Sequence, residues 1–433
     1  MLRKLSDSHV AVVGLGYVGM PLALMLAKHM DVTGFDIHVD RVRELKEGFD
    51  RNREIEGPLL RTTTCHFTSD LEEIRSCNVF IVTVPTPIDD QNKPDLGPVE
   101  AATRAVAGIL KKGDIVVYES TVYPGVTEDI CGPILEQGSG LKSGKHFFLG
   151  YSPERINPGD AEHTVQKITK VVSGQTDEVA DFLMDLYGQM NNGNVFRARD
   201  IRTAEASKAI ENAQRDINVA FINEVTMILN KLGLSSYDVL EAAGTKWNFL
   251  KFSPGLVGGH CIGVDPYYLA ECALNIGHEP RVILAGREIN DRMGPYVATC
   301  IHDLLTKQTG PGKNGKILLL GFTFKENIND IRNTKVLDIL KALQALGHDV
   351  AVHDPHARPE DVQQEYGIDI LSTLPERAEF DVAALLVGHE VYKEMTPESL
   401  QSIVKPGGVI YDMKGIWRPM ALELGYQFSY QTL

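Results

Sequence analysis

The sequence predicts an α/β protein in which two doubly wound, parallel sheets are joined by a central helical section with one long helix. Three observations lead to this prediction. A strand, a glycine turn, a helix and a second strand follow one another within residues 9–36, a stretch without Pro or Gly runs over residues 202–232, and the alternation resumes at residue 316. Alternating strands and helices favour parallel sheets with helices on both faces.

The first sheet is expected to cover roughly residues 1–195. The β-branched run at 9–13 predicts its first strand, residues 20–29 a helix, and residues 32–35 the second strand, which ends in Asp36. Further strands are expected at residues 79–84, 115–118 and 147–151, with helical stretches between them.

The middle section is expected to be helical. A helix over residues 202–232 would be about 46 Å long, and Gly233 is placed to end it. More helix is expected as far as residue 298, interrupted by the glycine-rich loop 254–263. The long helix suggests a rigid spacer and a dimer interface, although internal packing would explain its length equally well.

The last section returns to the α/β pattern. Strands are expected at residues 316–320, 349–353, 382–387 and 408–411, and a helix at 334–346. We therefore predict a Rossmann-like dinucleotide-binding domain over residues 1–198, a central helical domain that carries the glycine-rich loop over 199–300, and a second Rossmann-like domain over 301–433.

The composition excludes several classes of protein. A net charge of −15 over 433 residues gives no broad basic face for non-specific binding to nucleic acid. The six cysteines form no CxxC pair, which disfavours a disulfide framework and a zinc site and suggests a reducing, cytoplasmic compartment. No apolar run reaches the ~18 residues needed to span a bilayer, so no membrane partner is expected.

The glycine turn carries the features of a dinucleotide-binding fingerprint. Gly14 allows a tight turn, Gly16 lets the backbone approach a pyrophosphate, and Gly19 lets helix and strand pack closely. Asp36 stands at the end of the second strand, where its carboxylate can accept a hydrogen bond from a ribose 2′-OH and so favours NAD over NADP. A turn that serves only packing is the alternative.

Other polar groups follow the predicted strands. Arg41 lies one turn beyond Asp36 and could face the adenosine phosphates, or it could be a solvated surface arginine. Thr121 and Glu154 follow two strand ends, the edge at which open α/β sheets bind ligands, so both are expected near the nicotinamide. A loop cap would explain either residue as well.

The loop around Cys261 is the strongest candidate for covalent chemistry. Glycines surround this cysteine, Asp265 follows four residues later, and Lys251 precedes it by ten. Exposed backbone N–H groups can bind oxyanions, and a stabilised thiolate is a nucleophile. A buried, inert cysteine is the alternative.

Two further pairs of residues could bind anions. Lys208 and Asn212 are four apart on the long helix and so share a face, where they could stabilise a developing alkoxide, although such a pair is usually solvated. The second repeat replaces the three glycines with residues 321–325, which suggests a different nucleotide held by Lys325 and Arg332, or two ordinary surface charges.

Taken together, the motifs resemble those of the UDP-glucose/GDP-mannose dehydrogenase family over nearly the whole chain. The matching segments are GLGYVG (14–19), VTVPTP (82–87), ESTVYPG (119–125), SPER (152–155), EASKAIENA (205–213), VGGHCIGVDP (257–266) and GFTFKENINDIRNT (321–334). The resemblance implies two Rossmann-like domains around a helical dimerisation core, with NAD in the first domain and the nucleotide of a UDP-sugar in the last.

The resemblance also implies a four-electron oxidation of the sugar C6 alcohol to a carboxylate with two NAD. Cys261 would hold the aldehyde as a thiohemiacetal and then a thioester, which water hydrolyses. Lys208 and Asn212 would stabilise the oxyanion, while the side chains that organise water and proton transfer would be Asp265, Glu154 and Thr121.

The resemblance extends to binding residues. The NAD site would consist of Gly14, Gly16, Tyr17, Val18, Gly19, Asp36, Arg41, Thr83, Pro85, Thr86, Ser120, Thr121 and Arg332. The substrate would contact Glu154, Arg155, Lys208, Asn212, Phe249, Lys251, Gly258, Gly259, His260, Phe324 and Lys325.

The residues after Cys261 narrow the substrate. The run GHCIGVDPYY resembles the branch that acts on UDP-N-acetylhexosamines, UDP-N-acetylglucosamine or UDP-N-acetylgalactosamine, for surface polysaccharide. No residue decides between the two epimers. The alternatives are a UDP-glucose 6-dehydrogenase and an NAD-binding regulator without catalysis. A homodimer or higher homo-oligomer is expected.

Overall fold

A computed structural model describes residues 4–52, 55–89, 91–155, 166–259, 262–425 and 427–433. The chain divides into two compact units, one formed by residues 1–212 and 264–279 and the other by residues 213–263 and 280–433. In the part of the chain that is described, no helix is long and apolar enough to cross a membrane. The three-domain boundaries drawn from the sequence stay a prediction.

The first unit is built on a sheet with the strand order β3-β2-β1-β4-β5-β6-β7-β8. Strands β1 to β6 are parallel, as predicted, whereas β7 pairs antiparallel with β6. The strands are β1 (His9–Val13), β2 (Asp31–Phe35), β3 (His66–Thr68), β4 (Val79–Val82), β5 (Ile115–Tyr118), β6 (Phe148–Tyr151), β7 (Lys170–Gly174) and β8 (Val195–Arg197).

Helices cover both faces of this sheet because its strands are apolar on both sides. Val10 and Val12 of β1 face one hydrophobic core, and Ala11 and Val13 face the other. The first core includes α1 (Gly19–Ala27), α2 (Val39–Lys46), α3 (Gly57–Thr62) and α6 (Asp177–Gly188). The second includes α4 (Gly97–Ala107) and α5 (Gly132–Ser139).

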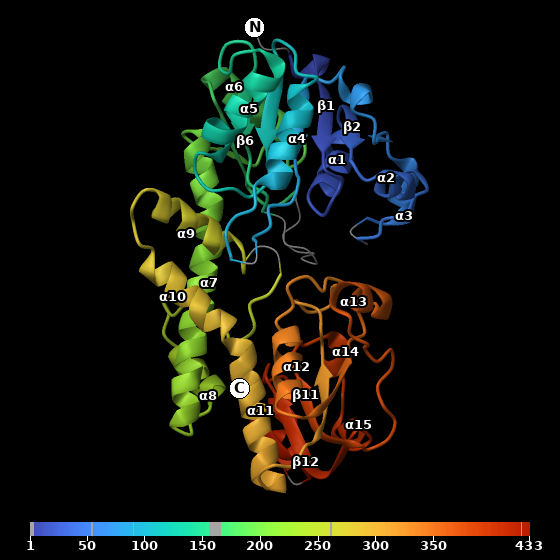
Figure 1. The fold of residues 1–433 in the computed structure, drawn as a ribbon, viewed down its shortest axis with the longest axis vertical. Helices are drawn as coiled ribbons and strands as arrows, with labels where there is room; N and C mark the ends of the chain where they lie inside the picture. The colour runs from blue at the N-terminus through green and yellow to red at the C-terminus, as the bar shows by residue number, and fades with distance from the viewer. Residues whose placement is uncertain (1–3, 53–54, 90, 156–165, 260–261, 426) are drawn as a thin grey trace. The chain divides into compact units, whose positions relative to one another are not determined.

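The predicted long helix is confirmed as α7 (Ile201–Lys231), drawn in green in Figure 1. Two residues in a turn conformation follow its end, and the second, Gly233, has the left-handed φ of +70° that favours glycine. The rest of the middle section is helical as well, and its described residues form α8 (Ser236–Ala243), α9 (Asp265–Asn275), α10 (Arg281–Asp291) and α11 (Met293–Thr309).

The second unit contains a parallel sheet with the order β10-β9-β11-β12-β13. Strands β9 and β10 have the predicted bounds. The strands are β9 (Lys316–Leu320), β10 (Asp349–His353), β11 (Phe380–Leu385), β12 (Val404–Asp412) and β13 (Ser429–Thr432).

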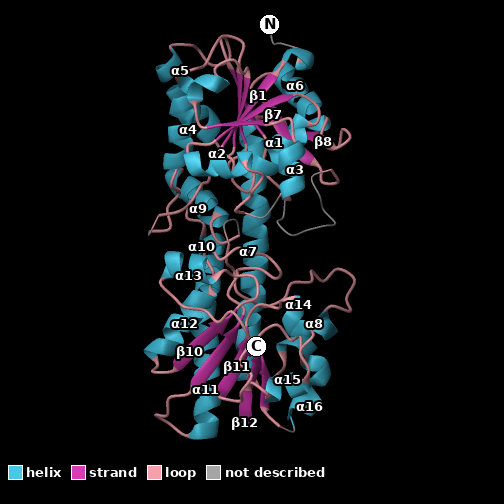
Figure 2. Ribbon diagram, turned by 90° about the vertical axis from the view of Figure 1, so that its right-hand side faces the viewer, coloured by secondary structure: helices cyan, strands magenta, loops and turns pink. Residues whose placement is uncertain are grey.

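Helices also flank both faces of this second sheet (Figure 2). One core packs the strands against α11, α12 (Val336–Ala345) and α13 (Pro359–Tyr366). The opposite core packs them against α14 (Glu390–Lys393), α15 (Pro397–Gln401) and α16 (Ala421–Gly425). The carboxyl ends of β1 to β6 therefore lie at one edge of the first sheet, and those of β9 to β13 at one edge of the second, where ligands of such sheets bind.

Candidate active site

The glycine turn between β1 and α1 has room for a pyrophosphate. A Cβ atom at Gly19 would lie 1.8 Å from the carbonyl oxygen of Gly14, so helix and turn can pack only around a glycine. Gly14 itself has φ +100°. A Cβ at Gly16, by contrast, would meet no atom within 4 Å. The open space above Gly16 is the approach that a dinucleotide requires.

The acidic residue of the fingerprint lies beside this turn. Asp36 is nearly buried, and its two carboxylate oxygens accept hydrogen bonds from the backbone N–H groups of Leu15 (2.8 Å) and His38 (2.9 Å). A carboxylate has lone pairs left over after two such bonds, so it can still accept from a ribose hydroxyl. The geometry of this end of the sheet therefore fits a dinucleotide.

Arg41 is not a solvated arginine. Its side chain is buried, its Nε donates to the carbonyl oxygen of Leu15 at 2.9 Å, and its guanidinium pairs with Asp50 at 2.7 Å. Arg41 thus stabilises the glycine turn through its hydrogen bond to Leu15. A direct contact between Arg41 and the cofactor stays a prediction.

The predicted residues at the ends of β4 and β5 brace the turn. The hydroxyl of Thr83 donates to the carbonyl oxygen of Gly14 at 2.7 Å, and that of Ser120 donates to the carbonyl oxygen of Val84 at 2.6 Å. Pro85 is exposed and Thr121 half-buried. The remaining predicted contacts, Tyr17, Val18 and Thr86, are half-buried beside the same edge of the sheet and stay predictions.

Lys208, Asn212 and Asp265 come together in the first unit. Lys208 and Asn212 lie on α7, and both are buried rather than solvated. The amide Nδ2 of Asn212 donates to Asp265, the first residue of α9, at 2.5 Å. Burial raises the pKa of Asp265 to about 6, although the charge of Lys208 and the hydrogen bond from Asn212 oppose that rise. The catalytic roles predicted for these three residues stay predictions.

Glu154 follows β6 and is nearly buried, and its carboxylate lies 3.7 Å from the ammonium of Lys170. Arg155 was predicted to bind substrate. In the structure its guanidinium pairs with Glu211 of α7 and donates to the carbonyl oxygen of Thr169 at 3.1 Å. A role for Arg155 in substrate binding stays a prediction.

Glu205, the first residue of the segment EASKAIENA, is a residue for which the sequence predicted no role. It is fully buried on α7, and its carboxylate accepts from the backbone N–H groups of Gly125 (2.6 Å) and Thr127 (2.9 Å). Burial raises the pKa of Glu205 to about 7, against the opposing effect of these hydrogen bonds. Glu205 therefore ties the loop that carries Thr121 to the helix that carries Lys208.

The glycine-rich loop is held by Asn223, a residue the sequence did not single out. Its amide donates to the carbonyl oxygen of Gly255 at 3.0 Å and accepts from the N–H of the same residue at 2.9 Å. Asn223 is buried and also donates to Asn290 at 2.8 Å. Cys261 and His260, the candidate nucleophile and its neighbour, lie outside the described residues. Of the residues before the loop, Phe249 is half-buried and Lys251 exposed.

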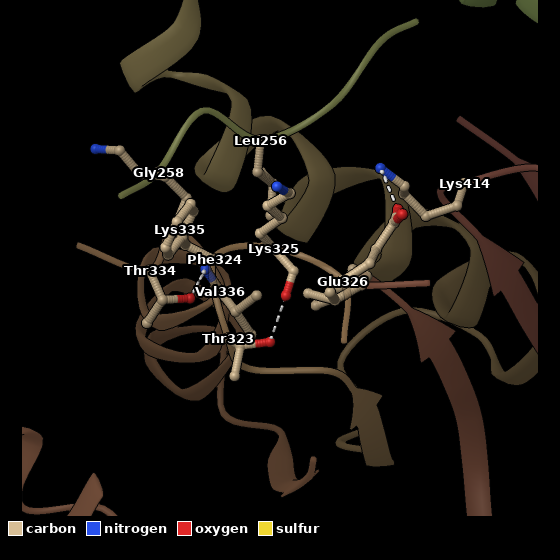
Figure 3. A pocket seen from close by; sticks show the side chains of 12 residues that line it. Leu256, Gly258, Thr323, Phe324, Lys325, Glu326, Thr334, Lys335, Val336 and Lys414 are labelled. Atoms are coloured by element: carbon tan, nitrogen blue, oxygen red, sulfur yellow. Dashed lines mark hydrogen bonds and ion pairs between the residues drawn. The ribbon is translucent and has the colours of Figure 1, made fainter. Parts of the chain in front are cut away.

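The turn after β9 lines a cavity of about 180 Å³ (Figure 3). Three lysines contribute to it, and one of them, Lys414, pairs with Glu326 at 3.2 Å. The full lining is Leu256, Gly258, Thr323, Phe324, Lys325, Glu326, Thr334, Lys335, Val336, Leu386, Val387 and Lys414. The predicted substrate residues Gly258, Phe324 and Lys325 are thus brought together in one cavity.

Two other predicted residues lie near this cavity. Gly259 is buried against the ring of Phe324, which would lie 2.7 Å from a Cβ at Gly259. Arg332 donates two hydrogen bonds to Asp330, at 2.8 and 2.6 Å. Its assignment to the cofactor stays a prediction. Across the described part of the chain, no group of three His, Cys, Asp or Glu side chains is arranged to hold a metal ion.

Family models match three consecutive parts of the chain. All three describe the UDP-glucose/GDP-mannose dehydrogenase family: its NAD binding domain matches residues 8–191, its central domain residues 202–292, and its UDP binding domain residues 318–419. A UDP-N-acetyl-D-glucosamine 6-dehydrogenase of Pseudomonas aeruginosa is 49% identical over 411 residues, which cover 95% of this chain and 97% of that protein. This chain belongs to the UDP-glucose/GDP-mannose dehydrogenase family.

Further relatives agree with this assignment. A UDP-N-acetyl-D-glucosamine 6-dehydrogenase of Salmonella typhi is 46% identical, covering 95% of this dehydrogenase and 96% of the relative. Among solved structures, a UDP-N-acetyl-D-mannosamine dehydrogenase of Pyrococcus horikoshii superposes with a TM-score of 0.85 at 29% identity, covering 94% and 96% of the two chains.

Membership of the family establishes the type of reaction. The protein is an NAD-dependent nucleotide-sugar dehydrogenase, with an NAD binding domain at residues 8–191 and a UDP-sugar as its substrate. The expected fold and cofactor are confirmed.

Proposed function

We propose that this enzyme oxidises the C6 hydroxyl of a UDP-N-acetylhexosamine to the uronic acid, with UDP-N-acetylglucosamine as its preferred substrate, and so supplies surface polysaccharide synthesis. The names of the P. aeruginosa and S. typhi relatives, at 49% and 46% identity, support this substrate. The structural observation that carries the proposal is the buried group of Lys208, Asn212 and Asp265.

This group has the chemistry that oxidation of an alcohol needs. A lysine ammonium and an amide N–H are donors that can stabilise an alkoxide, and one such fixed donor in a dry site contributes about 3 kcal/mol to the transition state. The Asn212–Asp265 hydrogen bond of 2.5 Å orients the amide, and both partners are buried. A carboxyl such as Asp265, whose pKa lies at about 6, can also exchange protons near neutral pH.

The covalent step is assigned to Cys261. NAD, when bound, accepts a hydride from C6 in each of the two oxidations. The Cys261 thiolate would add to the aldehyde carbon, giving a thiohemiacetal whose oxyanion Lys208 and Asn212 stabilise. Oxidation of that adduct leaves a thioester on sulfur, and attack by water releases the carboxylate and returns the thiolate. Glu154, Asp265 and Thr121 would position that water and take up its proton.

We assign the UDP part of the substrate to the cavity beside β9. Lys325, Lys335 and Lys414 line it, and the first turn of α12 begins there at Val336. Ammonium groups and the N–H groups of a helix N-terminus both attract a diphosphate. The cavity therefore has the charge that a UDP-sugar needs in a protein with a net charge of −15.

We also propose that the enzyme is a homodimer or a higher homo-oligomer through α7. Phe221 and Ile228 lie seven residues apart on this helix, so they share a face, and Leu232 follows just beyond its end; the three side chains are 58%, 52% and 66% exposed. Such an apolar stripe is typical of an interface. Light scattering that showed a monomer at micromolar concentration would contradict this assignment.

The enzyme's need for NAD and the free cysteines among its described residues support a cytoplasmic location.

Comparing kcat/KM for three UDP-sugars tests the proposed substrate. We expect UDP-N-acetylglucosamine to exceed UDP-N-acetylgalactosamine and UDP-glucose. A higher value for UDP-glucose would identify the enzyme as a UDP-glucose 6-dehydrogenase. Tight NAD binding without turnover of any of the three would indicate a regulator without catalysis.

The variant Cys261→Ser tests the covalent step. It should still bind UDP-sugar, because the cavity lysines are untouched, but should release no uronic acid. Full activity of Cys261→Ser would overturn the covalent mechanism.

A further inference from the structure

A buried lysine, Lys170, lies at the catalytic edge of the first sheet because β7 runs antiparallel to β6. Strands β6 and β7 pair antiparallel, with Gly150 opposite Gly174 and Tyr151 opposite Ser173. This register, continued beyond the last paired residues, brings Lys170, the first residue of β7, opposite Glu154. A parallel β7 would have put Lys170 at the other end of the sheet.

The ammonium of Lys170 is shared between two carboxylates. Its Nζ lies 2.5 Å from an oxygen of Glu119 and 3.7 Å from an oxygen of Glu154, and it donates to the carbonyl oxygen of Pro153 at 3.4 Å. The other oxygen of Glu119 accepts a hydrogen bond from the hydroxyl of Tyr187. Lys170 therefore connects Glu154 to a carboxylate deeper in the unit.

The burial of the three charged groups is graded. The side chains of Glu119, Lys170 and Glu154 are 0%, 6% and 11% exposed, so Glu154 is the outermost member. Burial tends to lower the pKa of Lys170, but the two carboxylates outweigh it and the pKa is raised, so the ammonium stays charged at neutral pH. Burial raises the pKa of Glu119, and the charge of Lys170 opposes that rise.

A simple structural ion pair does not account for this cluster. Lys170 and Glu119 already neutralise each other, and Tyr187 completes the hydrogen bonding of Glu119. Glu154 adds a second carboxylate beside the same ammonium, and its side chain is the most exposed of the three. Among the described residues, the titratable groups of this cluster beside Glu154 are Lys170, Glu119 and Tyr187, and the backbone N–H of Arg155 also donates to Glu154 at 2.6 Å.

We propose that Lys170 is a positioning residue for Glu154, keeping its carboxylate ionised and fixed at the catalytic edge of the sheet, while Glu119 and Tyr187 hold Lys170 in place. The proposal rests on the proposed function in one respect, namely that Glu154 takes part in proton transfer. A nearby cation favours the charged form of a carboxylate, and a nearby anion disfavours it. Removing Lys170 and removing the charge of Glu119 should therefore shift the titration of Glu154 in opposite directions.

Two variants and one control test this inference through the pH profile of kcat/KM. In Lys170→Met the acidic limb should move up by about one pH unit or more, with roughly tenfold lower activity at a pH on that limb. In Glu119→Gln the acidic limb should move to lower pH, because Lys170 then interacts with the carboxylate of Glu154 and no longer with that of Glu119. Lys170→Arg should restore the wild-type limb. Lys167→Met, which removes an exposed lysine three residues earlier, should leave the limb unchanged.

A second measurement separates this inference from the proposed function. The carboxyl carbon resonance of Glu154 in 13C-labelled enzyme, assigned by its loss in Glu154→Gln, can be titrated without substrate. The expected shifts of its pKa in Lys170→Met and Glu119→Gln would support the positioning role even if no UDP-sugar were turned over, a result that would contradict the function alone. An unchanged titration of Glu154 in folded Lys170→Met or in Glu119→Gln, or a shift of the same sign in both, would overturn the inference.

Discussion

The two units of this enzyme contain the same backbone turn after their first strands. In the first unit Gly14, at φ +100°, donates its N–H to the carbonyl oxygen of Phe35 at 2.8 Å. In the second unit Gly321, at φ +99°, donates to the carbonyl oxygen of His353 at the same distance of 2.8 Å. In both units the residue after the glycine donates its N–H to the aspartate that follows the second strand, Asp36 or Asp354.

The two turns differ in what surrounds that aspartate. The carboxylate of Asp36 accepts from two backbone N–H groups, of Leu15 and His38. That of Asp354 accepts from four, of Phe322, Thr323, His356 and Ala357. It also accepts from the ring of His389 at 2.9 Å.

Because the two turns share the same geometry, what distinguishes them is the set of protein groups around the aspartate. Asp36 keeps capacity for a ribose, and the space above Gly16 is open. Asp354 is saturated by its own chain, and the second position after Gly321 is the buried Thr323 rather than a glycine. The second turn has therefore become a structural support for the cavity that holds Lys325.

The largest expected effect separates the two aspartates. Asp354→Asn should lower the free energy of unfolding by about 3 kcal/mol, because a buried carboxylate with five donors is replaced by an amide whose NH₂ faces N–H groups. Asp36→Asn should cost about 1 kcal/mol of stability and weaken NAD binding. Denaturant unfolding of both variants checks this. Equal stability losses would show that the two aspartates do the same job.

The next effect tests the open space above Gly16. In Gly16→Ala the added Cβ meets no protein atom, so the melting temperature should not change, but it would occupy the pyrophosphate approach and weaken NAD binding by about 2 kcal/mol, or roughly 30-fold. Calorimetric titration with NAD measures this. Gly425→Ala is the matched control, since a Cβ there also meets no atom within 4 Å. NAD binding by Gly16→Ala as tight as by the wild type would place the cofactor elsewhere.

A smaller effect tests the second turn as a support for a cation site. Lys325→Met should weaken UDP binding by about 1.5 kcal/mol, or roughly tenfold, through loss of a charged contact, and should leave NAD affinity unchanged. Titration with UDP and with NAD separates the two. Lys313→Met, at an exposed lysine that precedes β9, serves as the control. Weakened NAD binding instead would contradict the division of ligands between the turns.

The smallest expected effect is a loss of stability to unfolding at acidic pH. Burial alone would raise the pKa of Asp354, but the hydrogen bonds from His389 and the backbone hold it well below its usual range. Its contribution is therefore complete above the ordinary aspartate pKa and is lost as the pH falls toward the lowered value. Between pH of about 4 and 3, wild-type stability should fall about 1 kcal/mol per pH unit faster than that of Asp354→Asn. If stability fell equally fast with pH in the wild type and in Asp354→Asn, groups other than Asp354 would be responsible for the loss of stability in acid.

The sequence predicted the regular parts of both units because their signals are local. Strands β1, β5, β9 and β10 have the predicted bounds, and α7 differs from the predicted helix by one residue at each end. A β-branched run, a glycine at a turn and an uninterrupted helical pattern can each be recognised from one continuous stretch of sequence. Lys208 and Asn212 were found in the same way, from their spacing on one helix.

The residues that the sequence missed act across long separations. Lys170 meets Glu119 over 51 positions, and Glu205 meets Gly125 over 80. No spacing rule links such partners. Strand β7 has only two consecutive apolar residues, Val171 and Val172, and β8 is three residues long, so neither gives a clear pattern. A lysine that opens an apolar strand and a glutamate on the apolar side of a helix are the signals that could have drawn attention to them.

The number of NADH molecules formed per molecule of limiting UDP-N-acetylglucosamine tests the proposed four-electron oxidation. We expect two, measured by absorbance, because the alcohol passes through an aldehyde held on Cys261 and on to the acid. One NADH per sugar would contradict it, since the enzyme would then be a simple alcohol dehydrogenase and Cys261 would have no covalent role.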